Sequence, residues 1–357
     1  MSEFYIIPAD KTREWMDVLS VVEQYDFYHL PGYHQLHEDS GKGALVVFRE
    51  GEKIIALPLL VRKISSIPGL EKYTDCFDAT SVYGYAGPVA NKKAASDQKF
   101  LNSAREAFFC FAKQRNWVTV FSRLHPVLKD QCFLVGLGET VKLGSTVGID
   151  LSLPYEQQRA NYRKDHKYGI NKLRRQGVTV RLDKTFESLH EFVEIYHETM
   201  KRVGADKSYF FPYSYFSKLC SLKNGCAFHL FLCNSGDRIV SGGLFSECNQ
   251  IIQYHLSGTI TSWLRMAPMK LIIDEVRLWA NQRSEMKYFH LGGGVGSAED
   301  SLFRFKAGFS PMRFPFHIWR WIVQHDLYRQ LVDERRRWYE KRDENFPEND
   351  FFPAYRQ

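Results

Sequence analysis

The sequence lacks every paired-cysteine pattern. Its seven cysteines are odd in number, and no two of them form a C-x-x-C pair. They stand at Cys76, Cys110, Cys132, Cys220, Cys226, Cys233 and Cys248. The pattern therefore excludes a zinc knuckle and a dithiol redox site. We expect reduced cysteines that lie mostly in the core, since most of them stand inside apolar runs.

Long hydrophobic runs are also missing. No run of about 18 consecutive apolar residues, the length of a membrane-spanning helix, occurs in the chain. The first residues, MSEFYIIPADKTREWM, have no basic region followed by an apolar core, so they do not resemble a secretory signal. We expect a soluble, cytoplasmic protein.

The motifs of several enzyme classes are absent as well. The chain has no P-loop pattern G-x-x-x-x-G-K-[ST], no G-x-S-x-G nucleophile turn and no H-E-x-x-H zinc pattern. Gly292 and Gly294 begin a glycine pattern, but Ser297 stands where a dinucleotide fingerprint needs its third glycine. We therefore expect no bound metal and no ATP or dinucleotide held by these motifs.

The composition is that of a globular protein with a basic excess. Hydrophobic residues make up 44% of the 357 residues and charged residues 25%, so a sizeable core is available. The net charge of +7 favours anionic partners such as phosphates, nucleotides, RNA or an acidic membrane surface. Nothing in the pattern indicates DNA.

One α/β pattern occurs twice along the chain. VVFREGEKIIALPLL (46–60) and LFLCNSGDRIVSGGLF (230–245) both read as hairpins, and Gly51 aligns with Gly236 at their turns. After each hairpin comes a helical pattern and then a strand, WVTVF in the first copy and KYFHL in the second. The alternative is chance similarity between two ordinary α/β segments.

The repeat predicts an α/β (α+β) fold of two similar domains. We expect the first domain at 1–145 and the second, which carries the presumed active site, at 146–315. Residues 316–357 are expected to form a C-terminal helix and a tail that packs back on the body, because 316–344 reads as a long amphipathic helix.

Basic residues gather in two segments of the second half. NYRKDHKYGINKLRRQG (161–177) is predicted as a basic helix ended by Gly177, and it includes Arg163 and Lys167. Such a helix is either a solvated face or a landing surface for phosphates. The segment 196–211 adds Arg202, Lys207 and Tyr209.

The stretch KYFHLGGGVGSAEDSLFRFKAGFSP (287–311) holds the candidate chemistry. Glycines at a strand end offer N–H donors to a carbonyl or oxyanion, although a turn with positive φ explains them equally well. Lys306 stands among three phenylalanines, so it either reaches solvent or is held in an apolar site. His290 is either an acid/base group or a histidine at the core edge, and Asp300 is the better candidate for contacting an amine.

Four segments together resemble the Fem family, the FemA/FemB/FemX-type aminoacyltransferases and their GNAT-like acyltransferase relatives. These segments are YHETMKRVGADKSYFF, YHLSGT, APMKLIIDEV and FHLGGGVGSAEDSLFRFKAGFSP. YGYAGPV and FSRLHPVL in the first half resemble that family's N-terminal domain. The resemblance extends from about residue 25 to 355, and its most specific part is the glycine run with FKAGF.

The resemblance implies two tandem GNAT-like domains and an acyltransferase. Members transfer an amino acid from a charged tRNA to an amine of a peptidoglycan precursor, or act on amines of other envelope precursors. The acyl donor is a co-substrate, and no metal or redox cofactor is used. Lys306 matches the lysine of the family's F-K-x-x-F motif, and Gly292, Gly293 and Gly294 match the glycines before it.

Two departures from related proteins bear on the donor. The coiled-coil arm of some members is missing, because Leu173 to Phe210 is too short and lacks heptads. The pyrophosphate loop of GNAT enzymes is absent after YHLSGT, which argues against acyl-CoA as the donor. We therefore expect an aminoacyl-tRNA or another acyl carrier. His37 and Lys42 fall in the region where the family's first domain binds the precursor, but no motif fixes them there.

These residues predict aminolysis of an activated ester. The glycine N–H groups and Lys306 would stabilise the oxyanion, and Asp300 would orient the amine. Phosphate and substrate contacts are expected from Arg163, Lys167, Arg202, Tyr209 and Phe305. Two alternatives stay open. One is an acyl-CoA-dependent N-acyltransferase on a nucleotide sugar or polysaccharide, and the other is a non-catalytic RNA- or envelope-complex binding protein. Peripheral contact with a membrane-bound precursor is compatible with any of them.

Overall fold

Two glycine turns close two antiparallel hairpins. Gly51 has φ +58° and Gly236 has φ +57°, conformations that glycine adopts without strain. The first turn joins β2 to β3, which pair from Lys42–Val61 to Glu50–Lys53. The second joins β9 to β10, with a bulge between Ile239 and Ser241. Both predicted hairpins are confirmed.

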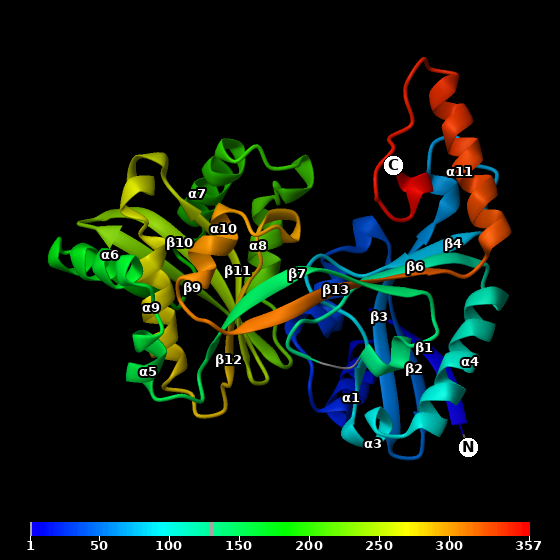
Figure 1. Cartoon of the computed structure of the whole chain (residues 1–357), viewed down its shortest axis with the longest axis horizontal. Coiled ribbons are helices and arrows are strands. Elements are labelled where there is room, and N and C mark those ends of the chain that lie inside the picture. The colour runs from blue at the N-terminus through cyan, green and yellow to red at the C-terminus, as the bar shows by residue number, and fades with distance from the viewer. Residues whose placement is uncertain (1, 129–130) are drawn as a thin grey trace. The chain divides into compact units, whose positions relative to one another are not determined.

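The computed structural model describes residues 2–128 and 131–357 and divides the chain into two compact units (Figure 1). Unit 1 consists of Met1–Leu143 and Phe316–Gln357, and unit 2 of Gly144–Pro315. The chain therefore enters unit 2 along strand β7 and leaves it along strand β13.

Unit 1 is built around a mixed sheet with the strand order β1-β2-β3-β4-β6-β13. Its strands are β1 (Ser2–Pro8), β2 (Lys42–Glu50), β3 (Lys53–Lys63), β4 (Phe77–Thr80), β5 (Val89–Ala90), β6 (Trp117–Arg123) and β13 (Arg313–Ile322). Its helices are α1 (Thr12–Val22), α2 (Pro31–Gln35), α3 (Lys92–Ala95), α4 (Gln98–Gln114) and α11 (His325–Glu340). Among the described strand pairs of this order, β4 and β6 run parallel and the others run antiparallel.

Unit 2 follows the order β8-β9-β10-β11-β12-β7. Its strands are β7 (Glu139–Asp150), β8 (Thr179–Asp183), β9 (Cys226–Ser235), β10 (Arg238–Cys248), β11 (Ile251–Thr259) and β12 (Tyr288–Gly292). Its helices are α5 (Tyr155–Ala160), α6 (Lys164–Arg175), α7 (Leu189–Arg202), α8 (Tyr213–Cys220), α9 (Met269–Ala280) and α10 (Ser301–Ala307). The parallel pair here is β11 with β12.

The two units share one topology. In each, three antiparallel pairs are followed by a parallel pair and then by an antiparallel last strand. The parallel partner follows an amphipathic helix, α4 in unit 1 and α9 in unit 2. The last strand of each unit is out of sequence order. β13, which follows the strands of unit 2 along the chain, completes unit 1, and β7, which precedes the other strands of unit 2, completes unit 2. The predicted duplication of one α/β unit is confirmed by this order.

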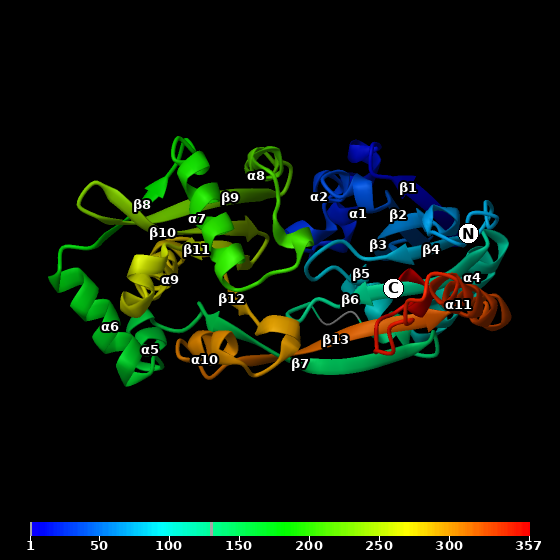
Figure 2. The same ribbon diagram turned by 90° about the horizontal axis from the view of Figure 1, so that it is seen from above.

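Two adjacent glycines of β10 show how helices cover unit 2. A Cβ on Gly242 would meet Phe192 of α7, whereas a Cβ on Gly243 would approach Met269 of α9. Successive residues of a strand point to opposite faces, so α7 and α9 lie on opposite faces of the sheet. Figure 2 shows α7 lying across β10 and β11. The α9 face forms a core with Ile272, Val276 and other apolar side chains of the unit.

The prediction of a helix over 316–344 is wrong in its first part. Residues Arg313–Ile322 form β13, and helix α11 begins only at His325. In β13 buried side chains alternate with more exposed ones from Arg313 to Ile318, which is the period of a strand. The sheet of unit 1 needs this strand as its last member, and that need cannot be seen within the segment itself.

The cysteines differ in burial. Cys233 and Cys248 are buried, but Cys110 lies exposed on α4, so the expected core position fails for Cys110. None of the helices in the described residues combines the length and apolarity needed to cross a membrane.

Candidate functional site

Strands β11 and β12 pair only at their start. The parallel ladder joins Ile251 to Tyr288 and ends where Gln253 pairs with His290. Beyond that point β11 continues beside β10 and β12 continues beside β7. The ladder between the two strands therefore ends at this pair, and we call the region beyond it, between β11 and the end of β12, the split.

His290 lies where the split begins, in the last pair between β11 and β12. Its Nδ1 lies 2.7 Å from Oε1 of Gln253, and its Nε2 lies 2.7 Å from Oγ1 of Thr146. The imidazole is fully buried. Both ring nitrogens are engaged with neighbouring strands, so the geometry agrees with a histidine of the core rather than with an acid/base group that reaches substrate.

Lys306 enters the split from helix α10. Its Nζ donates a hydrogen bond of 2.7 Å to the carbonyl oxygen of Gly293, just beyond β12. The same ammonium lies 5.4 Å from the ring centre of Tyr254 on β11. Only 8% of the residue is exposed, so it does not reach out to solvent. Burial lowers the pKa of Lys306 to about 8, while the nearby Asp300 opposes the shift.

Asp300 caps the helix that carries Lys306. Its Oδ1 accepts the N–H of Phe303 at 2.8 Å, and its Oδ2 accepts the N–H of Val295 at 3.1 Å. Burial pushes the pKa of Asp300 upward, but these backbone N–H groups outweigh it and the net shift is downward. The carboxylate therefore stays ionised and holds the glycine loop against the start of α10.

The glycine run allows this loop to fold tightly. Gly292 has φ +79°, and a Cβ on Gly294 would overlap Ala298 and the carboxylate of Asp300. We expected the run to present N–H groups beside Lys306, but the glycine atom that contacts the ammonium is the carbonyl oxygen of Gly293. The glycines therefore allow the loop to pack closely and to bind Lys306 through a backbone carbonyl.

The basic helix begins later than predicted. Helix α6 starts at Lys164 after the separate helix α5, and Gly177 follows its end with φ +75°. Arg163 pairs with Asp165 at 3.1 Å, and Lys167 donates to the carbonyl of Ala160 at 2.7 Å. Both predicted phosphate ligands are thus already bonded within the protein.

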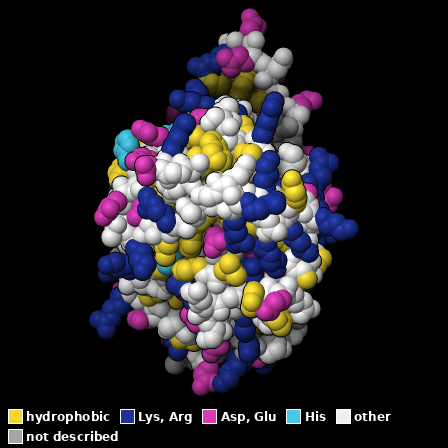
Figure 3. Space-filling model, turned by 90° about the vertical axis from the view of Figure 1, so that its left-hand side faces the viewer, with side chains coloured by type: hydrophobic (Ala, Val, Ile, Leu, Met, Phe, Trp, Pro, Cys, Tyr) yellow, Lys and Arg dark blue, Asp and Glu magenta, His cyan; other side chains and the backbone are white. Residues whose placement is uncertain are grey.

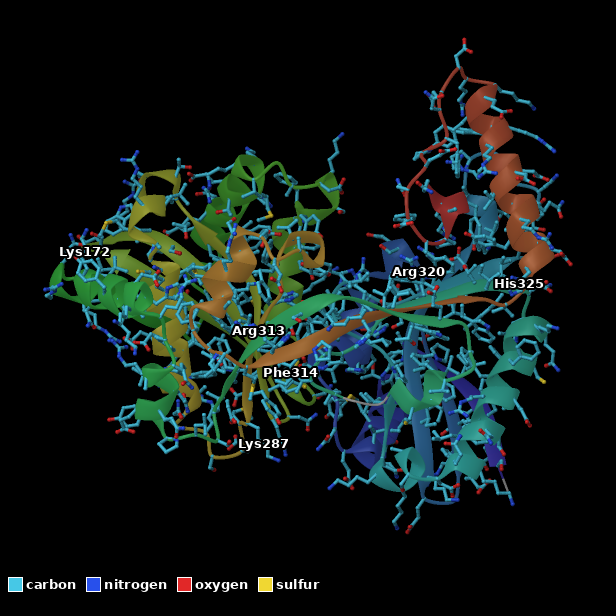
Figure 4. All side chains as sticks on the ribbon, in the orientation of Figure 1. Lys172, Lys287, Arg313, Phe314, Arg320 and His325 are labelled. Carbon is cyan, nitrogen blue, oxygen red and sulfur yellow. The ribbon has the colours of Figure 1, made fainter. Side chains whose placement is uncertain are left out.

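Other cations of α6 point outward. Lys164, Lys172 and Arg175 are exposed, and Figure 4 labels Lys172. Figure 3 faces the end of unit 2 that carries α6 and shows many Lys and Arg side chains across it, with Asp and Glu side chains between them. A cavity of about 440 Å³ opens on the same helix, lined by Tyr168, Asn171, Arg174 and Arg175.

The remaining predicted residues lie apart from Lys306 or face other groups. Arg202 donates to the carbonyl of Thr259 at 3.0 Å and so joins the end of α7 to the end of β11. Tyr209 is 38% exposed. Phe305 packs its ring against His166 and Phe309. The structure brings together Gly292–Gly294, Asp300 and Lys306, while Arg163, Lys167 and Arg202 bond to other protein groups.

Two residues of the site were not found from the sequence. Tyr254, whose ring faces Lys306, stands in the YHLSGT segment and shows no local signal of that contact. His166, a lone histidine in the basic helix, contacts the backbone of α10. Both contacts join segments far apart in the chain, so spacing alone could not reveal them.

A second cavity lies at the start of β13, where Figure 4 labels Arg313. It measures about 390 Å³, and its polar lining comes from Asp150, Gln158, Asn161, Ser310 and Arg313 rather than from Lys306. Within the described residues, no group of three or more His, Cys, Asp or Glu side chains is placed to hold a metal ion.

Residues 160–306 match the family model of the acetyltransferase (GNAT) domain. None of the curated proteins matches the chain at a significant level. The matched segment contains β8 to β12 and most of α10, so it includes the split and Lys306.

Three solved structures share the fold. The crystal structure of FemX matches with a TM-score of 0.68 at 13% identity, over 92% of this chain and 99% of that one. The C-terminal domain of a putative lysylphosphatidylglycerol synthetase from Agrobacterium fabrum gives 0.55 at 14%, over 90% and 95%. L-PGS from Bacillus licheniformis gives 0.52 at 13%, over 82% and 87%. The resemblance drawn from the motifs is confirmed at the level of the fold.

Proposed function

We propose that this chain, which carries a GNAT acyltransferase domain in a FemX-like fold, is an N-acyltransferase of the Fem type. It transfers an aminoacyl or acyl group to an amine of a cell-envelope precursor, such as a peptidoglycan peptide. The observation that carries this proposal is the buried ammonium of Lys306 in the split between β11 and β12. We place the reaction in unit 2 and in the cytoplasm.

The reaction needs little more than positioning and charge. The acceptor amine attacks the ester carbonyl, a C–N bond forms, and the C–O bond to the carrier breaks as the amine loses a proton to the leaving group. Aminoacyl esters are activated, so an oriented amine needs no strong general base. The negative charge that develops on the carbonyl oxygen is what the site must stabilise.

Lys306 supplies this stabilisation in our proposal. With a pKa of about 8 it is mostly protonated at neutral pH. A cation held away from water acts on a nearby oxyanion more strongly than a solvated one. One N–H of the ammonium donates to the carbonyl oxygen of Gly293, so in our proposal the other two N–H groups can donate to the substrate. Asp300 keeps the ammonium charged and is our candidate for orienting the amine.

The exposed cations of α6 support a polyanionic donor. Lys164, Lys172 and Arg175 are exposed, and Tyr168 in the adjoining cavity is 64% exposed. Phosphate neutralisation by such residues binds nucleic acid in a salt-dependent way. We therefore favour an aminoacyl-tRNA as donor, with Arg163, Lys167, Arg202, Tyr209 and Phe305 as further proposed contacts for the substrates.

A second candidate function keeps the chemistry and changes the donor. The matched family model describes acetyltransferases, which favours an acyl-CoA-dependent transferase on a nucleotide sugar or polysaccharide. A third, a non-catalytic binding protein for RNA or an envelope complex, predicts that Lys306→Ala leaves function intact.

The test begins with a thermal-shift panel of CoA, acetyl-CoA, charged tRNA and uridine-diphosphate sugars on the full chain. A ligand that binds only the folded state raises the melting temperature, and the rise grows with the logarithm of its concentration divided by its Kd. Labelled-acyl transfer with the stabilising donor then identifies the acceptor. Stabilisation by charged tRNA supports the Fem-type reaction, and stabilisation by CoA alone overturns it in favour of the second candidate.

A further inference from the structure

Two carbonyl groups at the C-terminal end of helix α10 are held by His166 of α6 and by Arg163, which directly precedes α6. The imidazole Nε2 of His166 lies 2.9 Å from the carbonyl oxygen of Phe305, and the backbone N–H of Arg163 donates to that of Gly308 at 2.9 Å. The last carbonyls of a helix have few partners within the helix. The Phe305 carbonyl also accepts the N–H of Gly308 at 3.1 Å, so His166 adds an external contact to the end of the helix. Phe305 directly precedes Lys306.

The imidazole of His166 fits closely against α10. Its side chain is 1% exposed and its ring lies edge-on to Phe309, with centroids 4.6 Å apart. A Cβ on Gly308 would overlap the ring, although the backbone of Gly308 is ordinary helical backbone with φ −71°. The absence of a side chain at Gly308 is therefore explained by the space that His166 occupies.

We propose that His166 is a positioning residue for Lys306; this proposal rests on the function proposed for Lys306. Helix α10 has only seven residues, too few to be stable by itself. Asp300 holds its first turn and His166 holds its last. Lys306 directly follows Phe305, so the contact of His166 with the Phe305 carbonyl holds the backbone from which the Lys306 stem leaves.

The hydrogen-bond partners define the state of the ring. A carbonyl oxygen only accepts, so Nε2 must carry a proton. Nδ1 lies 3.0 Å from Oδ2 of Asp165, which also contacts Lys270 of α9 at 3.3 Å and pairs with Arg163. Burial lowers the pKa of His166, and the two acceptors oppose this shift. The neutral ring keeps its bond to Phe305, and the protonated ring adds a bond to Asp165.

Four variants separate positioning from packing. His166→Leu removes the donor, and His166→Gln offers an amide N–H near the place of Nε2. Gly308→Ala displaces the ring without touching its chemistry. Gly169→Ala on α6 is the matched control, because its added Cβ would meet only Lys270, in ordinary contact with Cδ at 3.4 Å and Nζ at 3.7 Å.

The experiment measures the reactivity of the Lys306 amine in the full-length protein, without substrate. Trinitrobenzenesulfonate labelling, read by peptide mass spectrometry, reports how often the amine becomes accessible through local opening. We expect labelling of Lys306 to rise at least about tenfold in His166→Leu and Gly308→Ala, and to stay near wild type in His166→Gln and Gly169→Ala. Exposed Lys172 is the internal standard.

Unchanged Lys306 labelling in folded His166→Leu overturns the proposal. If that variant does not fold, Gly308→Ala decides, and its unchanged labelling has the same meaning. Once the donor is known, His166→Leu should lower kcat with little change in KM, and His166→Gln should restore it. If Lys306→Ala proves fully active, the proposed function fails while the labelling result still decides whether His166 holds α10.

Discussion

The ammonium of Lys306 donates a 2.7 Å hydrogen bond to the carbonyl oxygen of Gly293. This bond joins helix α10 to the end of β12 at the place where β11 and β12 have separated. The cation is therefore fixed inside the sheet of unit 2 by backbone rather than by a carboxylate in direct contact. In the proposed reaction this charge would act on the oxyanion of the substrate.

Replacing Lys306 tests this directly. Lys306→Ala should lower kcat by about 10²–10³ with substrate affinity nearly unchanged, because the contact is made mainly in the transition state. Lys306→Arg should not restore full activity, since a planar guanidinium does not fit the place of a compact ammonium. Steady-state kinetics with the identified substrate pair measures both effects.

Lys287→Ala is the matched control, since Lys287 is an exposed lysine of the same unit (Figure 4). It should behave as wild type. Activity of Lys306→Ala within about threefold of wild type would contradict the catalytic role.

The burial of Lys306 should lower stability. Its pKa of about 8 in the folded state lies below the ordinary 10.5, so the unfolded chain binds more protons between these values. The free-energy cost of burying the ammonium is fully present below pH 8 and is relieved as the pH rises toward 10.5. Lys306→Met removes the charge but also the bond to Gly293. At pH 7 the free energy of unfolding of this variant should be higher than that of wild type by about 1–3 kcal/mol.

Urea unfolding at several pH values checks this prediction. The stability of wild type relative to Lys306→Met should rise between pH 8 and pH 10.5. A difference between the two proteins that does not vary with pH would show that Lys306 is not buried as a cation.

The exposed cations of α6 should contribute salt-dependent binding. Reversing Lys164, Lys172 and Arg175 to Glu should weaken binding of uncharged tRNA and flatten the dependence of its affinity on salt. Reversal of Arg163 and Lys167 should have a smaller effect, because both are already bonded within the protein. Fluorescence anisotropy over a salt series measures the slope.

Three exposed arginines of α11, Arg329, Arg336 and Arg337, provide a charge-matched control in unit 1. If their reversal flattens the slope as much as reversal on α6 does, the effect reflects net charge and α6 is only a solvated face.

The parts of this protein that could be predicted from sequence are those determined by local chemistry. The turns at Gly51 and Gly236 need positive φ, and each lies between β-branched runs, so the hairpins and the repeat were readable. Segment 316–322 was misread because its aromatic residues fit a helix or a strand, and only a distant partner, β6, decides between them.

The candidate site shows the same limit. The glycine run and Lys306 stand out locally, but the direction of the Gly293 carbonyl depends on how the loop closes on Asp300. The contact between His166 and Phe305 joins residues 139 positions apart, and no spacing rule connects them.

The C-terminal tail should hold unit 1 together through Tyr355. Its ring is fully buried with Leu331 and Val118, and its hydroxyl donates to Asp78 at 3.0 Å. Asp78 is buried as well and also pairs with Arg62 at 2.6 Å.

Tyr355→Ala empties this space and should cost about 3–5 kcal/mol of unfolding free energy. Tyr355→Phe removes the bonds of the hydroxyl to Asp78 and, at 2.8 Å, to Thr119, and should cost about 1–3 kcal/mol. Phe351→Ala, at a tail aromatic that is 54% exposed, is the control and should stay within about 0.5 kcal/mol of wild type. Urea denaturation ranks the three, and a Tyr355→Ala protein as stable as Phe351→Ala would mean that the tail only rests on unit 1.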